Sequence, residues 1–243
     1  MKALLLAAGL GTRLKPITNT IPKCLVPIGE KPLLRYWLDM LSSAGVNEFY
    51  INLFYRADAV RDFINQSSYK NQVTLIEESE LLGTGGTIKK NADLFSHQDF
   101  FLAHADNLCL TNFQNFIHAH HARPQHAAMT MMTFTPPDPR TCGVVELNDQ
   151  NIVHKFYEKV EKPPTNLANG AVFVMTPEVA QYAKHHPKTH FEISLEIIPQ
   201  FVGRILAWHN HDYHLDIGNP KTYQKAQDEN EIIQKLYQGF RLK

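Results

Sequence analysis

Short apolar segments alternate with helix-like segments through the first half of this 243-residue chain, and this order constrains the fold more than any other feature. Such alternation predicts βαβ units, in which parallel strands form one sheet with helices packed on its faces. The first segment, 2–7, is continuously apolar after Lys2, as expected for a strand buried on both faces. The expected strands are 3–7, 49–53, 73–76 and 100–103, and the expected helices are 32–44 and 57–64.

The second half has a different pattern, with strand-like pieces joined by turns rich in Pro and Asn. The expected strands there are 129–134, 143–147, 152–156 and 171–175. A helix is expected to start at Thr176-Pro177, and a single final helix at Asn219-Pro220. We therefore predict an α/β fold with a mostly parallel sheet and a small, partly antiparallel addition, in a single domain spanning 1–243.

The charge and cysteine content favours a cytoplasmic protein without nucleic-acid or membrane partners. Twenty-four Lys and Arg balance twenty-four Asp and Glu, so the chain has no overall positive field to attract nucleic acid or an anionic membrane. Three cysteines without a C-x-x-C pair suggest neither a disulfide framework nor a cysteine zinc site, and a reducing compartment is expected. The apolar run at the amino terminus stops at Gly9, too early for an export signal.

A glycine-containing loop directly follows the first expected strand and resembles a phosphate cradle. Gly9 and Gly11 let backbone N–H groups converge on an anion, while Arg13 and Lys23 supply positive charge. The dinucleotide fingerprint G-x-G-x-x-G is not met, because Leu14 stands where its third glycine belongs. No Walker sequence is present either. The loop thus predicts a local anion site of another kind.

The loop and the segment after it resemble a known family. Residues 9–16, followed by 22–27 with the sequence Pro-Lys-Cys-Leu-Val-Pro, closely resemble the signature of the sugar-1-phosphate nucleotidyltransferases, which make nucleotide-activated sugars. The resemblance implies a Rossmann-like three-layer sandwich with a mostly parallel central sheet. It also implies a nucleotide-binding half at about 1–110 and a sugar-phosphate-binding half at about 111–243.

Two carboxylates resemble the magnesium ligands of that family. Asp106 ends a strand-like run, with Ala105 in place of the usual glycine, and Asp216 lies in a segment similar to the family's Trp-x-Asp-Ile-Gly-Thr-Pro. The resemblance implies that these two residues bind Mg²⁺, and that Arg13, Lys23 and Asp106 take part in catalysis. The nucleotide-binding residues it implies are Leu6, Ala8, Gly9, Gly11, Thr12, Arg13, Lys23, Gly83, Thr84, Gly85 and Asp106.

The sugar-phosphate site is expected in the second half. Glu158-Lys159, with Asn169-Gly170 downstream, is similar to the family elements that hold sugar hydroxyls and the sugar's phosphate. The implied sugar-phosphate residues are Gly143, Glu158, Lys159, Asn169 and Asp216. Glu161-Lys162 is a rival for the Glu-Lys pair.

The implied reaction joins a nucleoside triphosphate and a sugar 1-phosphate, and releases pyrophosphate. The segment 158–170 looks most like the mannose- and heptose-1-phosphate guanylyltransferase branch, so GTP is the expected nucleotide. Uridylyl, cytidylyl and thymidylyl transfer stay open, as does a catalytically silent regulator that only binds nucleotide-sugars. A homo-oligomer is a further open alternative. The histidines at 118–121 and 209–214 are not expected to bind zinc. His209 and His211 are expected on one face of a strand, and His118 and His121 on the surface of a helix.

Overall fold

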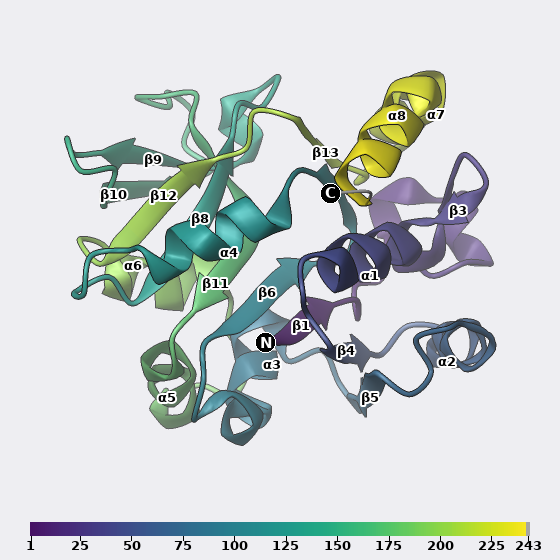
Figure 1. The fold of residues 1–243 in the computed structure, drawn as a ribbon, viewed down its shortest axis with the longest axis horizontal. Coiled ribbons are helices and arrows are strands. Elements are labelled where there is room, and N and C mark those ends of the chain that lie inside the picture. Colours follow the sequence, from purple (N-terminus) through teal and green to yellow (C-terminus); the bar gives the residue numbers. More distant parts are fainter. Residues whose placement is uncertain (242–243) are drawn as a thin grey trace. The chain divides into compact units, whose positions relative to one another are not determined.

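The computed structural model describes residues 1–241, which form two compact units (Figure 1). The first unit consists of Met1–Leu81, Ala103–Gln114 and the chain from Asp212 onward, and the second of Leu82–Leu102 and Asn115–His211. The sequence suggested continuous halves, 1–110 and 111–243. The division differs because the last segment of the chain packs with the first.

A parallel sheet is the centre of the first unit. Strand β1 (Lys2–Leu6) pairs with β4 (Glu48–Leu53), which pairs with β5 (Val73–Glu77). Strand β6 (Phe100–His104) neighbours β1 and is divided between the units after Leu102. Strand β1 is almost wholly buried, as its continuous apolar sequence predicts.

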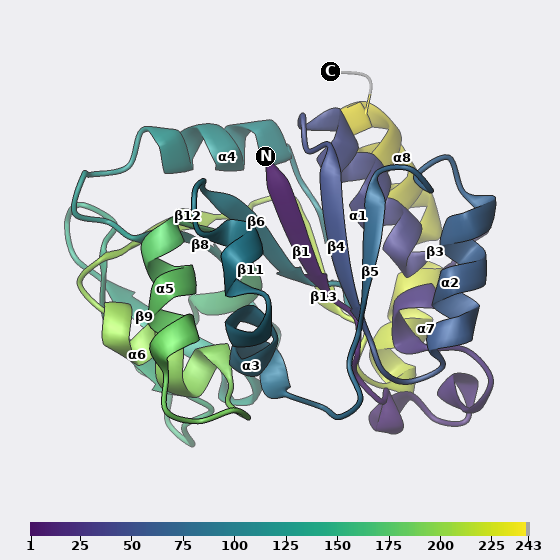
Figure 2. The same ribbon diagram turned by 90° about the horizontal axis from the view of Figure 1, so that it is seen from below.

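Helices and two small antiparallel sheets complete this unit. Figure 2 shows three of its helices along the same side of β4 and β5: α1 (Leu33–Ser43), α2 (Ala57–Gln66) and α8 (Asn230–Arg241). Helix α7 (Pro220–Asp228) precedes α8. The small sheets pair β2 (Pro27–Ile28) with β3 (Lys31–Pro32) and β7 (Asn107–Leu110) with β13 (Tyr213–Asp216).

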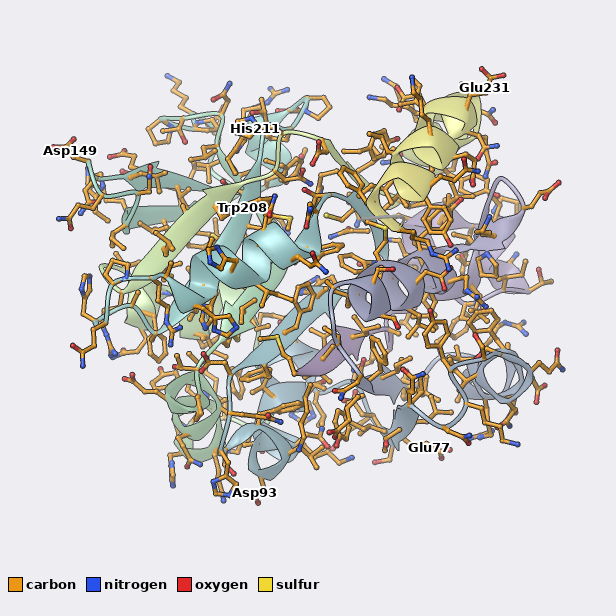
Figure 3. The ribbon with its side chains drawn as sticks, viewed as in Figure 1. Glu77, Asp93, Asp149, Trp208, His211 and Glu231 are labelled. Carbon is orange, nitrogen blue, oxygen red and sulfur yellow. The ribbon has the colours of Figure 1, made fainter. Side chains whose placement is uncertain are left out.

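The second unit contains the antiparallel addition. Strand β8 (Met129–Phe134) pairs with antiparallel β11 (Ala168–Met175) and parallel β12 (Ile205–His209), and β9 (Gly143–Leu147) pairs with antiparallel β10 (Val153–Glu158) and with β11. The helices are α3 (Gly83–Lys90), α5 (Pro177–His185), α6 (Ile198–Phe201) and α4 (Phe113–His121), of which α4 begins in the first unit. Trp208 of β12, labelled in Figure 3, packs on Phe116 of α4 with ring centroids 5.3 Å apart.

The mixed α/β fold with a mostly parallel sheet confirms the prediction, and the expected strands fall within a few residues of the observed ones. The expected single final helix is wrong, because the chain forms α7 and α8 with a break at Glu229. At this break the Glu229 carboxylate accepts a hydrogen bond from the Tyr213 hydroxyl at 2.8 Å. Within residues 1–241, no helix combines the length and apolar character that a membrane span requires.

Each unit buries a polar side chain that the hydrophobic pattern did not indicate, Asp39 in the first and His120 in the second. In the first, Asp39 of α1 accepts hydrogen bonds from Arg35, Tyr69 and Tyr237, so a carboxylate joins α1 to α8. In the second, His120 of α4 is fully buried between Thr130 and Asp99, at 2.9 and 3.0 Å from its two ring nitrogens. Both groups have hydrogen-bond partners, as buried polar groups must, and apart from Arg35 these partners come from other elements of the chain.

Candidate active site

The loop after β1 has the backbone geometry that its glycines predict. Gly11 adopts a left-handed φ of 62°, and a Cβ there would lie 2.8 Å from Thr18 Cγ2 and 3.3 Å from Lys23 Cβ. Any other residue would be both strained and crowded at this position. The Thr18 hydroxyl donates to the Gly11 carbonyl at 2.7 Å, and Tyr55 donates to the Thr18 carbonyl at 2.8 Å. The glycine turn is therefore held in place beside Lys23.

The remaining residues of the loop divide into buried and exposed ones. Leu6 and Ala8 are buried, whereas Gly9, Thr12 and Arg13 are exposed. Leu14 is also fully buried, so a packed side chain occupies the place of the third glycine of a dinucleotide fingerprint. The exposed part of the loop is thus the part that can meet a ligand.

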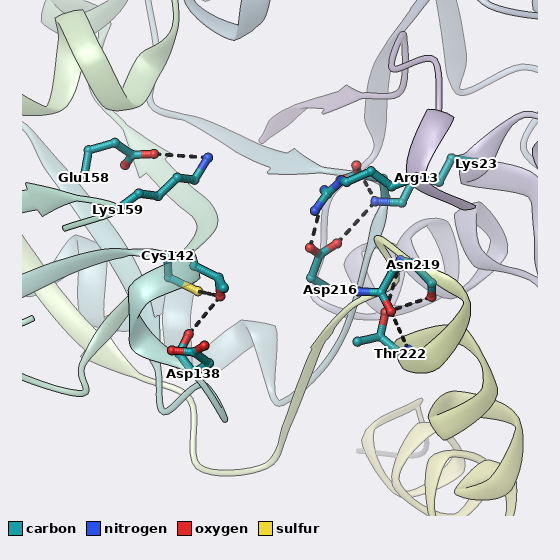
Figure 4. Close-up of polar contacts among 11 residues, drawn as sticks. Arg13, Lys23, Asp138, Cys142, Glu158, Lys159, Asp216, Asn219 and Thr222 are labelled. Carbon is teal, nitrogen blue, oxygen red and sulfur yellow. Dashed lines mark hydrogen bonds and ion pairs between the residues drawn. The ribbon is translucent and has the colours of Figure 1, made fainter. Parts of the chain in front are cut away.

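Lys23 contacts both acidic residues that the sequence singled out. Its Nζ lies 2.7 Å from Asp106 Oδ2 and 3.2 Å from Asp216 Oδ1, and Figure 4 shows the contact with Asp216. The Lys23 side chain is only 6% exposed, while those of Asp106 and Asp216 are 36% and 50% exposed. Two carboxylates separated by 110 residues of sequence thus converge on a single cation within the first unit.

The β7–β13 ladder explains how these carboxylates meet. Asp106 occupies the turn between β6 and β7, and the antiparallel register pairs Asn107 with Asp216. Asp216 is therefore paired with the residue next to Asp106. Position 218 also keeps the site open, because a Cβ on Gly218 would lie 2.7 Å from Asp216 and 3.0 Å from Arg13.

The charge of Lys23 keeps the Asp106 carboxyl ionised. Burial favours the neutral form of Asp106, but the charges of Lys23 and His104 outweigh it and hold the pKa of that carboxyl below its usual value. Arg13 adds a second cation, with its guanidinium 3.8 Å from Asp216 and 71% exposed. Burial and the Asp106 charge raise the pKa of Cys24 to about 12, so its thiol stays neutral and unsuited to nucleophilic attack.

The donor set of this cluster fits a hard divalent cation. The Lys23 ammonium already marks a point that oxygens of both Asp106 and Asp216 can reach. Mg²⁺ typically takes one or two protein carboxylates and keeps several waters. Among the residues described, no three or more His, Cys, Asp or Glu side chains are grouped to hold a metal ion. The residues present therefore fit Mg²⁺ better than a metal that needs a full set of protein ligands.

The turn 83–86, expected to approach the nucleotide, forms the first turn of α3 in the second unit. The N–H groups of Gly85 and Gly86 donate to the Phe191 carbonyl at 2.9 and 3.2 Å. The Glu192 carboxylate accepts from both the N–H and the hydroxyl of Thr84, at 3.1 and 2.7 Å. The segment around Phe191 therefore fixes this turn, and the N–H groups of Thr84, Gly85 and Gly86 already have partners in the chain.

Three of the sugar-phosphate candidates, Gly143, Glu158 and Asn169, lie on strands β9, β10 and β11 of the second unit, whereas Asp216 lies on β13 of the first unit. The β9–β10 register pairs Gly143 with Glu158, and a Cβ on Gly143 would lie 2.6 Å from the Glu158 carboxylate. On the other side of β9, Ala168 of β11 pairs with Val144, the residue after Gly143. Asn169 follows Ala168 in β11, so Glu158 and Asn169 come from the two strands that pair with β9.

The Glu-Lys pair at 158–159 lies at the end of a strand, and its rival lies farther along the chain. Glu158 ends β10, and its carboxylate lies 3.5 Å from the Lys159 ammonium. Lys159 has a left-handed φ of 49°, and its N–H donates to the Cys142 carbonyl at 3.2 Å. Glu161 and Lys162 follow in an exposed segment outside any strand.

The predicted site residues thus fall into three groups. The first unit brings together Gly11, Arg13, Lys23, Asp106 and Asp216. The second unit holds the other two groups: the 83–86 turn, and the set of Gly143, Glu158 and Asn169, called here the Gly143 group. Sequence reasoning missed the residues that support these groups: Thr18, Tyr55, Phe191, Glu192 and Gly218. Only Gly218 gave a signal, since it follows Asp216 in a recognised motif.

The sequence matches the nucleotidyl transferase family over residues 2–232. The chain belongs to this family. This match agrees with the two motifs, at 9–16 and 22–27, from which the sequence suggested the family.

This nucleotidyl transferase is similar to proteins of known name or known structure, three of which follow. A Schizosaccharomyces pombe mannose-1-phosphate guanyltransferase is 28% identical over 92% of this chain and 62% of its own length. HddC from Yersinia pseudotuberculosis, solved in complex with GMP-PN, is 28% identical with a TM-score of 0.78, covering 94% of this chain and 98% of that one. A Bacillus anthracis protein solved with sucrose shares the fold, with a TM-score of 0.85 at 19% identity and 95% coverage of both chains. The chain spans less than two thirds of the S. pombe relative.

Proposed function

We propose that this nucleotidyl transferase joins GTP to mannose 1-phosphate or heptose 1-phosphate, giving a GDP-sugar and pyrophosphate. The observation that carries the proposal is the convergence of Asp106 and Asp216 on Lys23 beside the glycine turn. The choice of GTP and mannose 1-phosphate rests on the name of the guanyltransferase relative, and the GMP-PN complex of HddC supports a guanine nucleotide.

The chemistry requires charge compensation more than proton transfer. An oxygen of the sugar's phosphate attacks the α-phosphorus of the triphosphate, and the bond between that phosphorus and the oxygen bridging to the β-phosphate breaks, so pyrophosphate leaves. The attacking oxygen is already ionised near neutral pH, so no general base is needed. Positioning and cationic groups dominate catalysis of such transfers.

The chain's own cations can be assigned to successive phosphates. Arg13, which is exposed beside Asp216, would bind the departing β- and γ-phosphates. Lys23 would neutralise the attacked phosphate, and Lys159 would bind the phosphate of the sugar. Asp106 and Asp216 would hold Mg²⁺, which when bound supplies further positive charge against the phosphate oxygens.

The Gly143 group would bind the sugar itself. Glu158 and Asn169 offer carboxylate and amide groups from neighbouring parts of the sheet, and the missing side chain at Gly143 leaves room for the Glu158 carboxylate and the Phe156 ring. Carboxylate and amide groups are ordinary partners for sugar hydroxyls, because they accept or donate several hydrogen bonds.

Substrate crossing tests this proposal. We would mix the protein and Mg²⁺ with each of GTP, UTP, CTP and dTTP against the 1-phosphates of mannose, glucose and heptose, and measure pyrophosphate release. The expected result is fastest release with GTP and mannose or heptose 1-phosphate. Faster turnover of another base would assign uridylyl, cytidylyl or thymidylyl transfer instead. Binding of a nucleotide-sugar without pyrophosphate release would indicate a silent regulator.

The cellular setting is part of the same proposal. Cys24, Cys109 and Cys142 are free thiols in the structure, which supports a reducing cytoplasm. Independence from nucleic acid and membranes, and the alternative of a homo-oligomer, stay predictions from the sequence. Light scattering of the purified protein measures the oligomeric state.

A further inference from the structure

The Lys23 ammonium occupies the point at which the proposed magnesium ligands converge. It contacts Asp106 at 2.7 Å and Asp216 at 3.2 Å, and its side chain is 6% exposed. Arg13, the other cation of the cluster, is exposed and contacts only the rim of the site, 3.8 Å from Asp216. Lys23 is therefore the cation that satisfies both carboxylates in the free chain.

An ammonium and a divalent cation cannot both occupy this point. They would repel each other and would use the same carboxylate oxygens, so binding of one opposes binding of the other. Lysine can leave without moving the backbone, since its charge sits at the end of a flexible four-carbon stem. The Lys23 backbone itself is held, because it lies in a 3₁₀ turn (Lys23–Leu25) with its Cβ against Gly11.

We propose that Lys23 competes with the divalent cation for Asp106 and Asp216, and that the triphosphate relieves the competition by giving the ammonium another partner. This inference rests on the proposed function. In the free protein, Lys23 keeps the two carboxylates together but weakens metal binding. When a nucleotide arrives, the ammonium transfers to a phosphate oxygen, and the carboxylates become available to the cation.

Manganese binding to the protein without nucleotide tests the competition. Free Mn²⁺ would be followed by electron paramagnetic resonance in the wild type, Lys23→Met and Lys23→Gln. A nearby opposite charge commonly changes the proton affinity of a carboxylate by about tenfold or more. We expect Mn²⁺ to bind both variants about tenfold or more tightly than the wild type. Unchanged or weaker binding in a folded variant would overturn the proposal.

Two controls separate competition from other effects of the substitution. Lys15→Met removes the same charge from an exposed position of the same loop and should leave Mn²⁺ affinity near the wild-type value. Adding Asp106→Asn to Lys23→Met should abolish the gain, since a ligand is lost. A gain of similar size in Lys15→Met would reduce the effect to general electrostatics and refute the specific role of Lys23.

The outcome is distinguishable from failure of the proposed function. If the wild type releases pyrophosphate but the Lys23 variants gain no Mn²⁺ affinity, only the competition is wrong. If no pyrophosphate appears with any substrate pair, the enzymatic proposal fails, while the Mn²⁺ titration still measures the competition.

Discussion

At the scale of single residues, the cluster shows how local backbone geometry and charge combine. Gly11 leaves space for Thr18 and Lys23, and Gly218 leaves space for Asp216 and Arg13. A side chain at Gly11 would collide with Thr18, and a side chain at Gly218 would collide with the Asp216 carboxylate. The cations and carboxylates can therefore approach one another without backbone distortion.

Replacement of Asp106 tests the acidic half of the cluster. Asp106→Asn keeps the size of the side chain but removes the charge that Lys23 and the proposed metal need. We expect kcat to fall by a factor corresponding to about 2.7 to 4 kcal/mol, the typical cost of losing one electrostatic contact to a transition state. Steady-state pyrophosphate release at saturating Mg²⁺ measures it. Asp149→Asn, in an exposed turn of the second unit, is the matched control. Near-normal turnover of Asp106→Asn would remove this residue from the mechanism.

The two candidate Glu-Lys pairs can be separated by matched lysine variants. Lys159 follows Glu158 at the end of β10, whereas Lys162 lies in an exposed segment. We expect Lys159→Ala to raise KM for the sugar 1-phosphate about tenfold or more, the effect of losing a charge-assisted hydrogen bond of about 1.5 to 3 kcal/mol. Lys162→Ala should leave KM unchanged. The reverse result would assign the sugar's phosphate to Lys162.

At the scale of elements, short strands and helix ends position the residues of the candidate site. The β7–β13 ladder sets Asp216 beside Asp106, and the capping box of Asn219 and Thr222 starts α7 directly after the Asp216 segment. In the second unit, the carbonyl of Phe191 and the carboxylate of Glu192 satisfy the first N–H groups of α3. An acidic group at this end also complements the helix dipole.

The close packing at the start of α3 gives a stability prediction. A Cβ on Gly85 would lie 2.4 Å from the ring of Phe191, which is buried and packs against the ring of His186 with the ring centroids 4.1 Å apart. Because the ring has little room to move, Gly85→Ala should destabilise the protein by about 1 to 3 kcal/mol. Gly239→Ala, in open space on α8, should instead stabilise it by about 0.5 to 1 kcal/mol. Chemical denaturation measures both, and equal effects of the two variants would contradict this packing.

At the scale of the whole molecule, the buried groups predict how stability depends on pH. Burial of His120 outweighs the neighbouring Asp99 charge and lowers the pKa of that imidazole below its usual value of 6.5. As pH falls below about 6.5, the unfolded chain takes up a proton at His120 before the folded protein does. The stability that this group contributes is therefore present above pH 6.5 and is lost as pH falls towards the lowered value.

Thermal unfolding between pH 7.5 and 5.5 measures this loss. Because other histidines also titrate in this range, the comparison needs His120→Asn, which should have a lower Tm at pH 7.5 but a smaller further decrease on acidification. His118→Gln, an exposed position on the same helix, should keep the wild-type pH dependence. A wild-type dependence that persists in His120→Asn would assign the acid sensitivity to another group.

The predictions that succeeded depend on patterns within short segments. The apolar run of β1, the alternation of strands and helices, and the Gly9–Gly11 turn each follow from local sterics or from burial of a continuous stretch. Asp39 and His120 could not be anticipated in the same way. Their burial depends on Tyr237 and Asp99, and no local pattern shows that those partners are present.

The sequence by itself determined the order of strands and helices, the glycine turn and the family, because these are encoded in neighbouring residues. Only the tertiary structure decided that Asp106 and Asp216 both contact Lys23, and that the chain from Asp212 onward belongs to the first unit. It also decided that the Phe191 carbonyl accepts hydrogen bonds from the first N–H groups of α3. The physical reason is that strand pairing and helix packing, which act between distant segments, bring these groups together.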